Sequence, residues 1–127
     1  MGSGLPPTMT EPLTREMVEK IDATLLPTLD RHHLRLLAHC LGSFQQMTAP
    51  GASRTIPSRD QQEQWCLKHP LLRDDPQFGT LLLNQFEAAA RQLETLAQSL
   101  GMAPLDLTLD HLIDQAVANA RARLDAP

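Results

Sequence analysis

The chain has 127 residues, a formal net charge of −4 and 42% apolar residues. This length fits one domain, and the composition is that of a globular protein rather than a disordered chain. The acidic balance argues against a general nucleic-acid binder, whose surface is basic, and no apolar run is long enough to span a membrane. The two cysteines, Cys40 and Cys66, are too few for a disulfide framework, so we expect both to be reduced and buried.

Residues 1–9 are expected to form a flexible leader before a single helical domain over residues 10–125. A signal peptide has a charged segment followed by an apolar segment, and the N-terminus lacks this pattern. The reducing cytoplasm is therefore the predicted location.

Two amphipathic helices are predicted in the first part of the domain. The shorter one ends near Leu26, because Pro27 disfavours a helical residue before it. Its apolar positions follow helical spacing and are Leu13, Met17, Ile21, Thr24 and Leu25. The second spans Leu29–Met47 and is capped by Thr28 or Asp30. Its predicted apolar stripe is Leu29, His33, Leu36, Leu37, Cys40, Leu41, Phe44 and Met47.

A loop and a short helix are predicted in the middle of the chain. Residues 48–57 contain two prolines and a glycine and form the expected mobile loop. Ser58 and Gln61 then make an S-x-x-Q capping box, which predicts a helix over residues 59–68.

The strongest helical pattern covers residues 76–100. Asp75 is suited to the N-cap, a proline follows in the first turn, and Gly101 suits the left-handed position after the last turn. The apolar positions fill an arc of about 160°, which Leu83 and Ala90 widen to about 200°, whereas a surface helix needs little more than about 100°. We therefore expect this helix to be central or to meet a second chain.

A last helix is predicted to begin after Thr108, whose hydroxyl is suited to the N-cap. No segment alternates in the manner of a strand over more than a few residues. The predicted fold is all-α: a single compact bundle of about five helices with one long central helix over residues 76–100.

A candidate protein interface surrounds the single tryptophan. Tryptophan is enriched where interfaces gain most of their energy, and this one lies on the least amphipathic helix beside the predicted loop. The candidate interface residues are Trp65, Leu71, Leu72 and Leu83.

A second candidate site would bind an anion. Its residues are Arg54, Arg59, Lys68 and Arg73. Acidic residues lie between them and weaken their field, so contact with nucleic acid is the less favoured interpretation.

No catalytic or metal-binding motif is present in the sequence. The five histidines lack the spacing of a zinc site, and we expect neither a metal nor a cofactor. His33 is expected at the edge of the core with one hydrogen-bond partner. A ligand site would need a cavity lined by His33 or Cys40 together with a polar partner.

The sequence favours a small cytosolic helical module for protein interaction, such as an adaptor, an assembly factor or a regulator, with no catalytic activity. We expect it to self-associate, a homodimer being favoured because two-fold dimers are the commonest oligomers. One alternative is a nucleic-acid-linked regulator that uses residues 54–73. The other is a helical bundle that binds a small ligand or acts as an enzyme.

Overall fold

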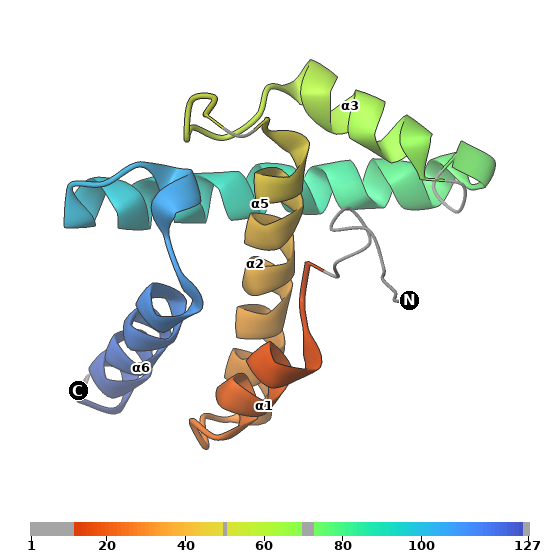
Figure 1. Ribbon diagram of the computed structural model, residues 1–127. Coiled ribbons are helices and arrows are strands. Elements are labelled where there is room, and N and C mark those ends of the chain that lie inside the picture. The colour runs from red at the N-terminus through yellow and green to blue at the C-terminus, as the bar shows by residue number, and fades with distance from the viewer. Residues whose placement is uncertain (1–11, 50, 70–72, 126–127) are drawn as a thin grey trace, which may run out of the picture.

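The computed structural model describes residues 12–49, 51–69 and 73–125. Within these ranges the chain forms five α-helices, one 3-10 turn and no strand, which confirms the predicted all-α fold (Figure 1). The helices are α1 (Arg15–Asp22), α2 (Thr28–Met47), α3 (Arg59–Lys68), α5 (Pro76–Leu100) and α6 (Leu109–Asp125), and the 3-10 turn η2 spans Pro104–Asp106. The predicted leader lies outside the described residues.

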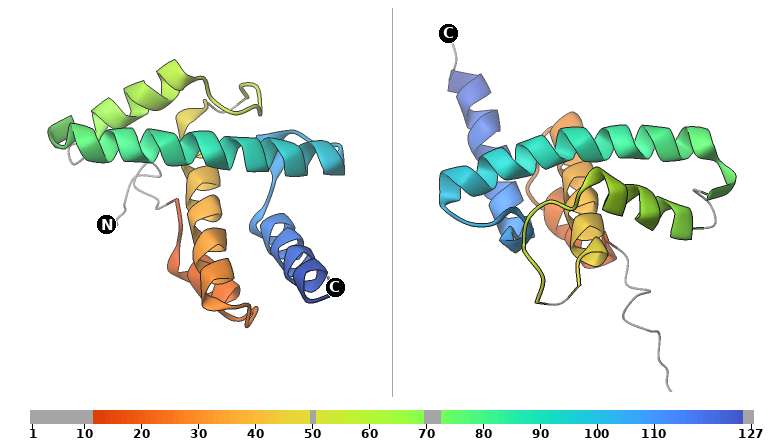
Figure 2. Two further views of the ribbon diagram at one scale, coloured as in Figure 1. Left: turned by 180° about the vertical axis from the view of Figure 1, so that it is seen from behind. Right: turned by 90° about the horizontal axis from the view of Figure 1, so that it is seen from above.

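Helix α2 joins the other elements together. It contacts α1, α3, α5, α6 and η2. Figure 1 shows α2 crossing the long helix α5, with α1 and α6 beside the part of α2 that extends away from α5. Seen from above in Figure 2, α3 and α6 lie at opposite halves of α5. The long helix is confirmed over residues 76–100, and α2 is the helix that contacts all the others.

The helix boundaries set by local side-chain chemistry match the sequence predictions. The Ser58 hydroxyl accepts from the Gln61 backbone N–H, and the Gln61 side chain accepts from the Ser58 backbone, so both halves of the capping box are present. Asp75 accepts from the backbone N–H of Phe78 at the start of α5, and Gly101 ends α5 with a φ of 68°. Only local hydrogen bonds are needed at these positions, which is why the sequence reveals them.

The predicted boundary between α1 and α2 is wrong. Helix α1 ends at Asp22 rather than near Leu26, because the Thr24 hydroxyl bonds the Ile21 carbonyl and accepts from the Leu26 N–H. Leu25 then takes a left-handed φ of 59°. The N-cap of α2 is Pro27, so neither Thr28 nor Asp30 caps it.

The predicted buried stripe of α2 is also partly wrong. Leu29 is 81% exposed and His33 is exposed, whereas Leu34 and Ala38 are buried. Helix α1 packs against α2, and Arg35 of α2 forms an ion pair with Asp22 of α1. The arc of apolar residues on one helix does not reveal how many other helices pack around that helix.

The core lies where α2, α3 and α5 meet. Phe44 of α2 and Phe86 of α5 are fully buried, with ring centroids 5.1 Å apart. Leu93, Leu105 and Leu112 extend the core towards η2 and α6. Cys40 and Cys66 are free and buried within it, as expected.

Candidate functional site

Large apolar side chains are exposed on α3 and on the first two turns of α5. We call Trp65, Leu67, Phe78 and Leu81 the α3–α5 surface. Leu67, Phe78 and Leu81 are 55%, 51% and 61% exposed, and Trp65 is half-buried. Single exposed leucines are ordinary on monomeric proteins. Here four large apolar residues lie on two helices that contact each other, and a patch formed jointly by their side chains would be typical of a protein-binding surface.

Polar contacts fix α3 to its surroundings. The Gln62 side chain is buried and donates to the Pro57 carbonyl at 2.9 Å, which holds the preceding loop against the helix. Arg59 pairs with Glu63 on its own helix and reaches Glu87 of α5 at 3.9 Å. These exposed ion pairs orient α3 more than they stabilise the fold.

An aromatic row connects the core to the α3–α5 surface. The Trp65 ring lies 6.0 Å from the ring of buried Phe86 in an edge-on arrangement. The Trp65 ring also lies 4.1 Å from the ring of exposed His69. Because Phe86 also contacts Phe44, the row runs from α2 through α5 to the end of α3. Trp65 is therefore held in one orientation with part of its ring open to solvent.

The predicted interface residues have different surroundings. Trp65 and Leu83 are both half-buried and pack against the core, and of the two only Trp65 belongs to the α3–α5 surface as defined above. Leu71 and Leu72 lie outside the described residues. Phe78 and Leu81 belong to the helix predicted over residues 76–100, and their exposure distinguishes them from its buried residues. The excessive width of the apolar arc of this helix was the signal that part of it faces solvent.

The candidate anion-binding residues are mostly paired with carboxylates. Arg54 contacts Asp106 at 2.9 Å, Arg59 has the acidic neighbours described above, and Arg73 lies 3.9 Å from Asp74. Lys68 has no ion-pair partner within the described residues. A basic patch formed by the four residues stays a prediction, and their pairing weakens it.

The loop over residues 48–57 is attached to η2. Arg54 donates to the Leu105 carbonyl at 2.7 Å, and its own carbonyl accepts from the Leu105 N–H. The Gln45 side chain donates to the same Leu105 carbonyl. Pro50 lies outside the described residues, and the mobility of the loop stays a prediction.

A cavity of about 470 Å³ lies between α2, α5 and α6, and we call it the α2–α5–α6 cavity. Leu37, Leu96, Leu112 and Ala116 supply its apolar lining. The sequence-based ligand hypothesis required such a cavity beside His33 or Cys40. His33 does line it, and its Nε2 lies 2.9 Å from Oε1 of Gln92, whereas Cys40 is buried in the core. The hydrogen-bond partner of His33 is confirmed, but its expected place at the core edge is wrong because the side chain is exposed.

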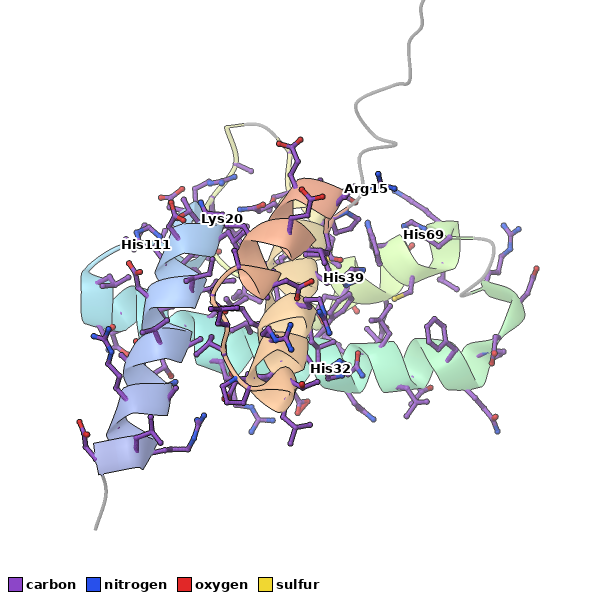
Figure 3. All side chains as sticks on the ribbon, turned by 90° about the horizontal axis from the view of Figure 1, so that it is seen from below. Arg15, Lys20, His32, His39, His69 and His111 are labelled. Atoms are coloured by element: carbon purple, nitrogen blue, oxygen red, sulfur yellow. The ribbon has the colours of Figure 1, made fainter. Side chains whose placement is uncertain are left out.

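The described histidines are distributed over several helices. Figure 3 shows His32 and His39 on α2, His69 at the end of α3 and His111 on α6, and no three metal-ligating residues gather in the described ranges. Burial lowers the pKa of His39 and raises the pKa of the Cys40 thiol to about 12. A thiol with so high a pKa is protonated at neutral pH and is a poor nucleophile.

The helices in the described ranges do not combine the length and apolar character that crossing a bilayer requires. Searches of curated proteins and of solved structures gave no match to the chain. The model of one protein family, described as NDH complex assembly factor CRR9, matches residues 13–123. Since this match covers most of the helical domain, the chain belongs to the CRR9 family of NDH complex assembly factors.

Proposed function

We propose that this chain is a non-enzymatic assembly factor that binds a protein subunit of the NDH complex through its α3–α5 surface. The family supports a role in assembly and a protein partner. The observation that carries the choice of surface is the exposure of Leu67, Phe78 and Leu81 beside the half-buried Trp65. A partner that covered them would remove their apolar area from water, which is the main driving force of protein association.

The same surface explains how the chain can recognise a partner without large rearrangement. Trp65 is already oriented by Phe86, and Leu81 projects from a helix whose start is fixed by Asp75. Such preformed side chains lose little conformational freedom on binding. In the bound state, these side chains would cover an apolar surface of the subunit. The next subunit of the complex would later displace the chain from that surface.

The proposal is tested by binding of the purified chain to isolated NDH subunits, measured by calorimetry. Leu81→Asp should weaken binding by about tenfold or more, because burying one leucine contributes roughly 1.5–3 kcal/mol and the new carboxylate would be desolvated. Leu81 is exposed, so the melting temperature should stay close to that of the wild type.

Leu29→Asp is the matched control. Leu29 is a leucine in the first turn of α2, it is 81% exposed, and it lies outside the α3–α5 surface. Wild-type affinity for Leu29→Asp together with weak binding by Leu81→Asp supports the proposal. Equal affinities for the two variants would reject the α3–α5 surface as the binding site.

Self-association is a separate expectation, and the homodimer inferred from the sequence stays a prediction. Light scattering on the same samples measures the mass in solution. A dimer that Leu81→Asp dissociates would mean that the chain covers its own α3–α5 surface before it meets a subunit. The cytoplasmic location also stays a prediction.

A further inference from the structure

The α2–α5–α6 cavity has features that packing alone does not require. Its apolar floor consists of Leu37, Leu96, Leu112 and Ala116, of which Leu112 is almost fully buried. At about 470 Å³ it has roughly three times the volume of a 150 Å³ apolar cavity that holds one benzene molecule. It therefore has room for about three side chains of leucine or phenylalanine size.

Two rows of polar, uncharged side chains border this floor. Gln92, Thr95 and Ser99 lie one turn apart on α5, and Gln115 and Asn119 lie one turn apart on α6. The Thr95 and Ser99 hydroxyls donate to carbonyls of their own helix, which leaves their oxygens able to accept. Within the described residues, the amide nitrogens of Gln92 and Asn119 donate to no other group. The border thus offers both donors and acceptors, as a peptide backbone requires.

The charge around the cavity is almost nil. Among the residues that the structure describes, no carboxylate lines the cavity, and the guanidinium of its lining residue Arg91 pairs with Glu87 at 2.9 Å. A charged side chain of an occupant would find no unpaired opposite charge in this described lining, and its contact with the apolar floor would be unfavourable. The occupant that fits this cavity is therefore neutral.

The exposure of the residues that border the cavity indicates which kind of occupant suits it, a peptide or a small molecule. Gln92, Thr95, Ser99, Gln115 and Asn119 are all exposed, so the cavity opens widely between α5 and α6. Sites for small molecules usually enclose most of the ligand surface. An open, neutral depression with an apolar floor and amide borders instead suits side chains that project from a larger partner.

We infer that the α2–α5–α6 cavity is a second docking site, which takes an uncharged peptide segment of a protein partner through about three apolar side chains. This inference rests on the proposed function for the identity of the partner, an NDH subunit. The cavity is lined by residues in the second half of α5, whereas Phe78 and Leu81 lie in its first half, so one subunit could contact both sites or two subunits could each contact one.

The test uses short overlapping peptides, acetylated and amidated, that tile the NDH subunits, and follows their binding to the full chain by NMR titration. We expect the binding peptides to share an uncharged apolar stretch and to shift the backbone signals of residues around Ala116. Ala116→Phe should weaken binding by about tenfold or more, because the new ring fills space meant for a partner side chain. Ala118→Phe, on the same helix but exposed and outside the cavity, should bind as the wild type does.

A second pair of variants covers the case in which Ala116→Phe does not fold. Gln115→Glu places a charge on the cavity border with little change in shape and should also weaken binding. Gln98→Glu, an exposed residue of α5 that does not line the cavity, is its control.

Three results would overturn the inference. In the first, Gln115→Glu and Ala116→Phe bind the peptides with wild-type affinity. In the second, a neutral small molecule is released from the purified chain on denaturation, which would assign the cavity to that molecule. In the third, the intact subunits bind but no peptide does, which leaves the proposed function standing and rejects this site. If neither subunits nor peptides bind, both proposals are wrong.

Discussion

The clearest single-residue prediction concerns Gly42, where the backbone of Pro12 passes directly over α2. A Cβ atom at position 42 would lie 2.5 Å from the carbonyl oxygen of Pro12 and 2.9 Å from its Cα atom. Both are backbone atoms, so no rotation of a side chain can relieve the contact. Gly42→Ala must therefore displace the segment before α1 or distort α2.

Two opposing effects determine the size of the change. Overpacking of this kind costs about 1–3 kcal/mol, whereas alanine is favoured over glycine inside a helix by about 0.8–1.0 kcal/mol. For the full chain we expect a net loss of about 1 kcal/mol in the free energy of unfolding. When residues 1–12 are deleted, the obstacle is gone, and the same substitution should instead stabilise the chain by about 1 kcal/mol.

Urea denaturation is measured for four proteins: the full chain and the chain without residues 1–12, each with Gly42 and with Gly42→Ala. The comparison tests whether the effect of the substitution on stability changes sign. Far-UV circular dichroism reports the helices, and fluorescence of the single tryptophan, Trp65, reports the region where α3 packs on α5. If Gly42→Ala stabilises the full chain as much as the shortened chain, the backbone of Pro12 does not lie on Gly42 and the reasoning fails.

The burial of His39, of the two cysteines and of Leu93 has consequences that can be measured. Burial lowers the pKa of His39 in the folded chain, so on acidification the unfolded chain takes up its proton first. The free energy of unfolding should therefore fall as the pH drops below the ordinary histidine pKa of 6.5. His39→Gln should flatten this part of the curve of stability against pH, and an unchanged slope would contradict the prediction. The raised pKa values and burial of Cys40 and Cys66 predict that a thiol reagent labels neither cysteine until denaturant unfolds the chain, which fast labelling in native buffer would disprove. Leu93 is completely buried, so Leu93→Asp should cost at least about 3 kcal/mol and leave little folded protein by circular dichroism, and a cooperative melt near that of the wild type would refute its place in the core.

Local chemistry explains which parts of the fold could be predicted. The capping box of Ser58 and Gln61 and the left-handed Gly101 need only neighbours in the sequence, and all occur where predicted. The buried face of α2 depends on which helices pack around it. Leu34 and Ala38 are buried in the assembled fold, and the positions of the helices that pack on α2 are not visible in the α2 pattern.

The candidate site shows the same limit on a finer scale. Leu81 and Leu83 are two residues apart and therefore point about 200° apart around α5. The sequence identified an apolar arc too wide for burial on one side, but the packing of the helix decides that Leu83 faces the core and Leu81 faces solvent. The α2–α5–α6 cavity depends on the relative positions of three helices, which the sequence pattern does not show. The sequence therefore predicted that His33 has a hydrogen-bond partner but did not identify Gln92 as that partner.

Gene replacement in the cell shows whether this chain assists assembly of the NDH complex through its α3–α5 surface. The native gene would be replaced by the Leu81→Asp variant, by the Leu29→Asp control or by a deletion, and the assembled NDH complex would be quantified on native gels, with the level of each variant checked by immunoblot. We predict that Leu81→Asp lowers the amount of complex towards that of the deletion while Leu29→Asp keeps the wild-type amount. Wild-type levels of complex with Leu81→Asp, or an equal loss with both variants, would contradict the account.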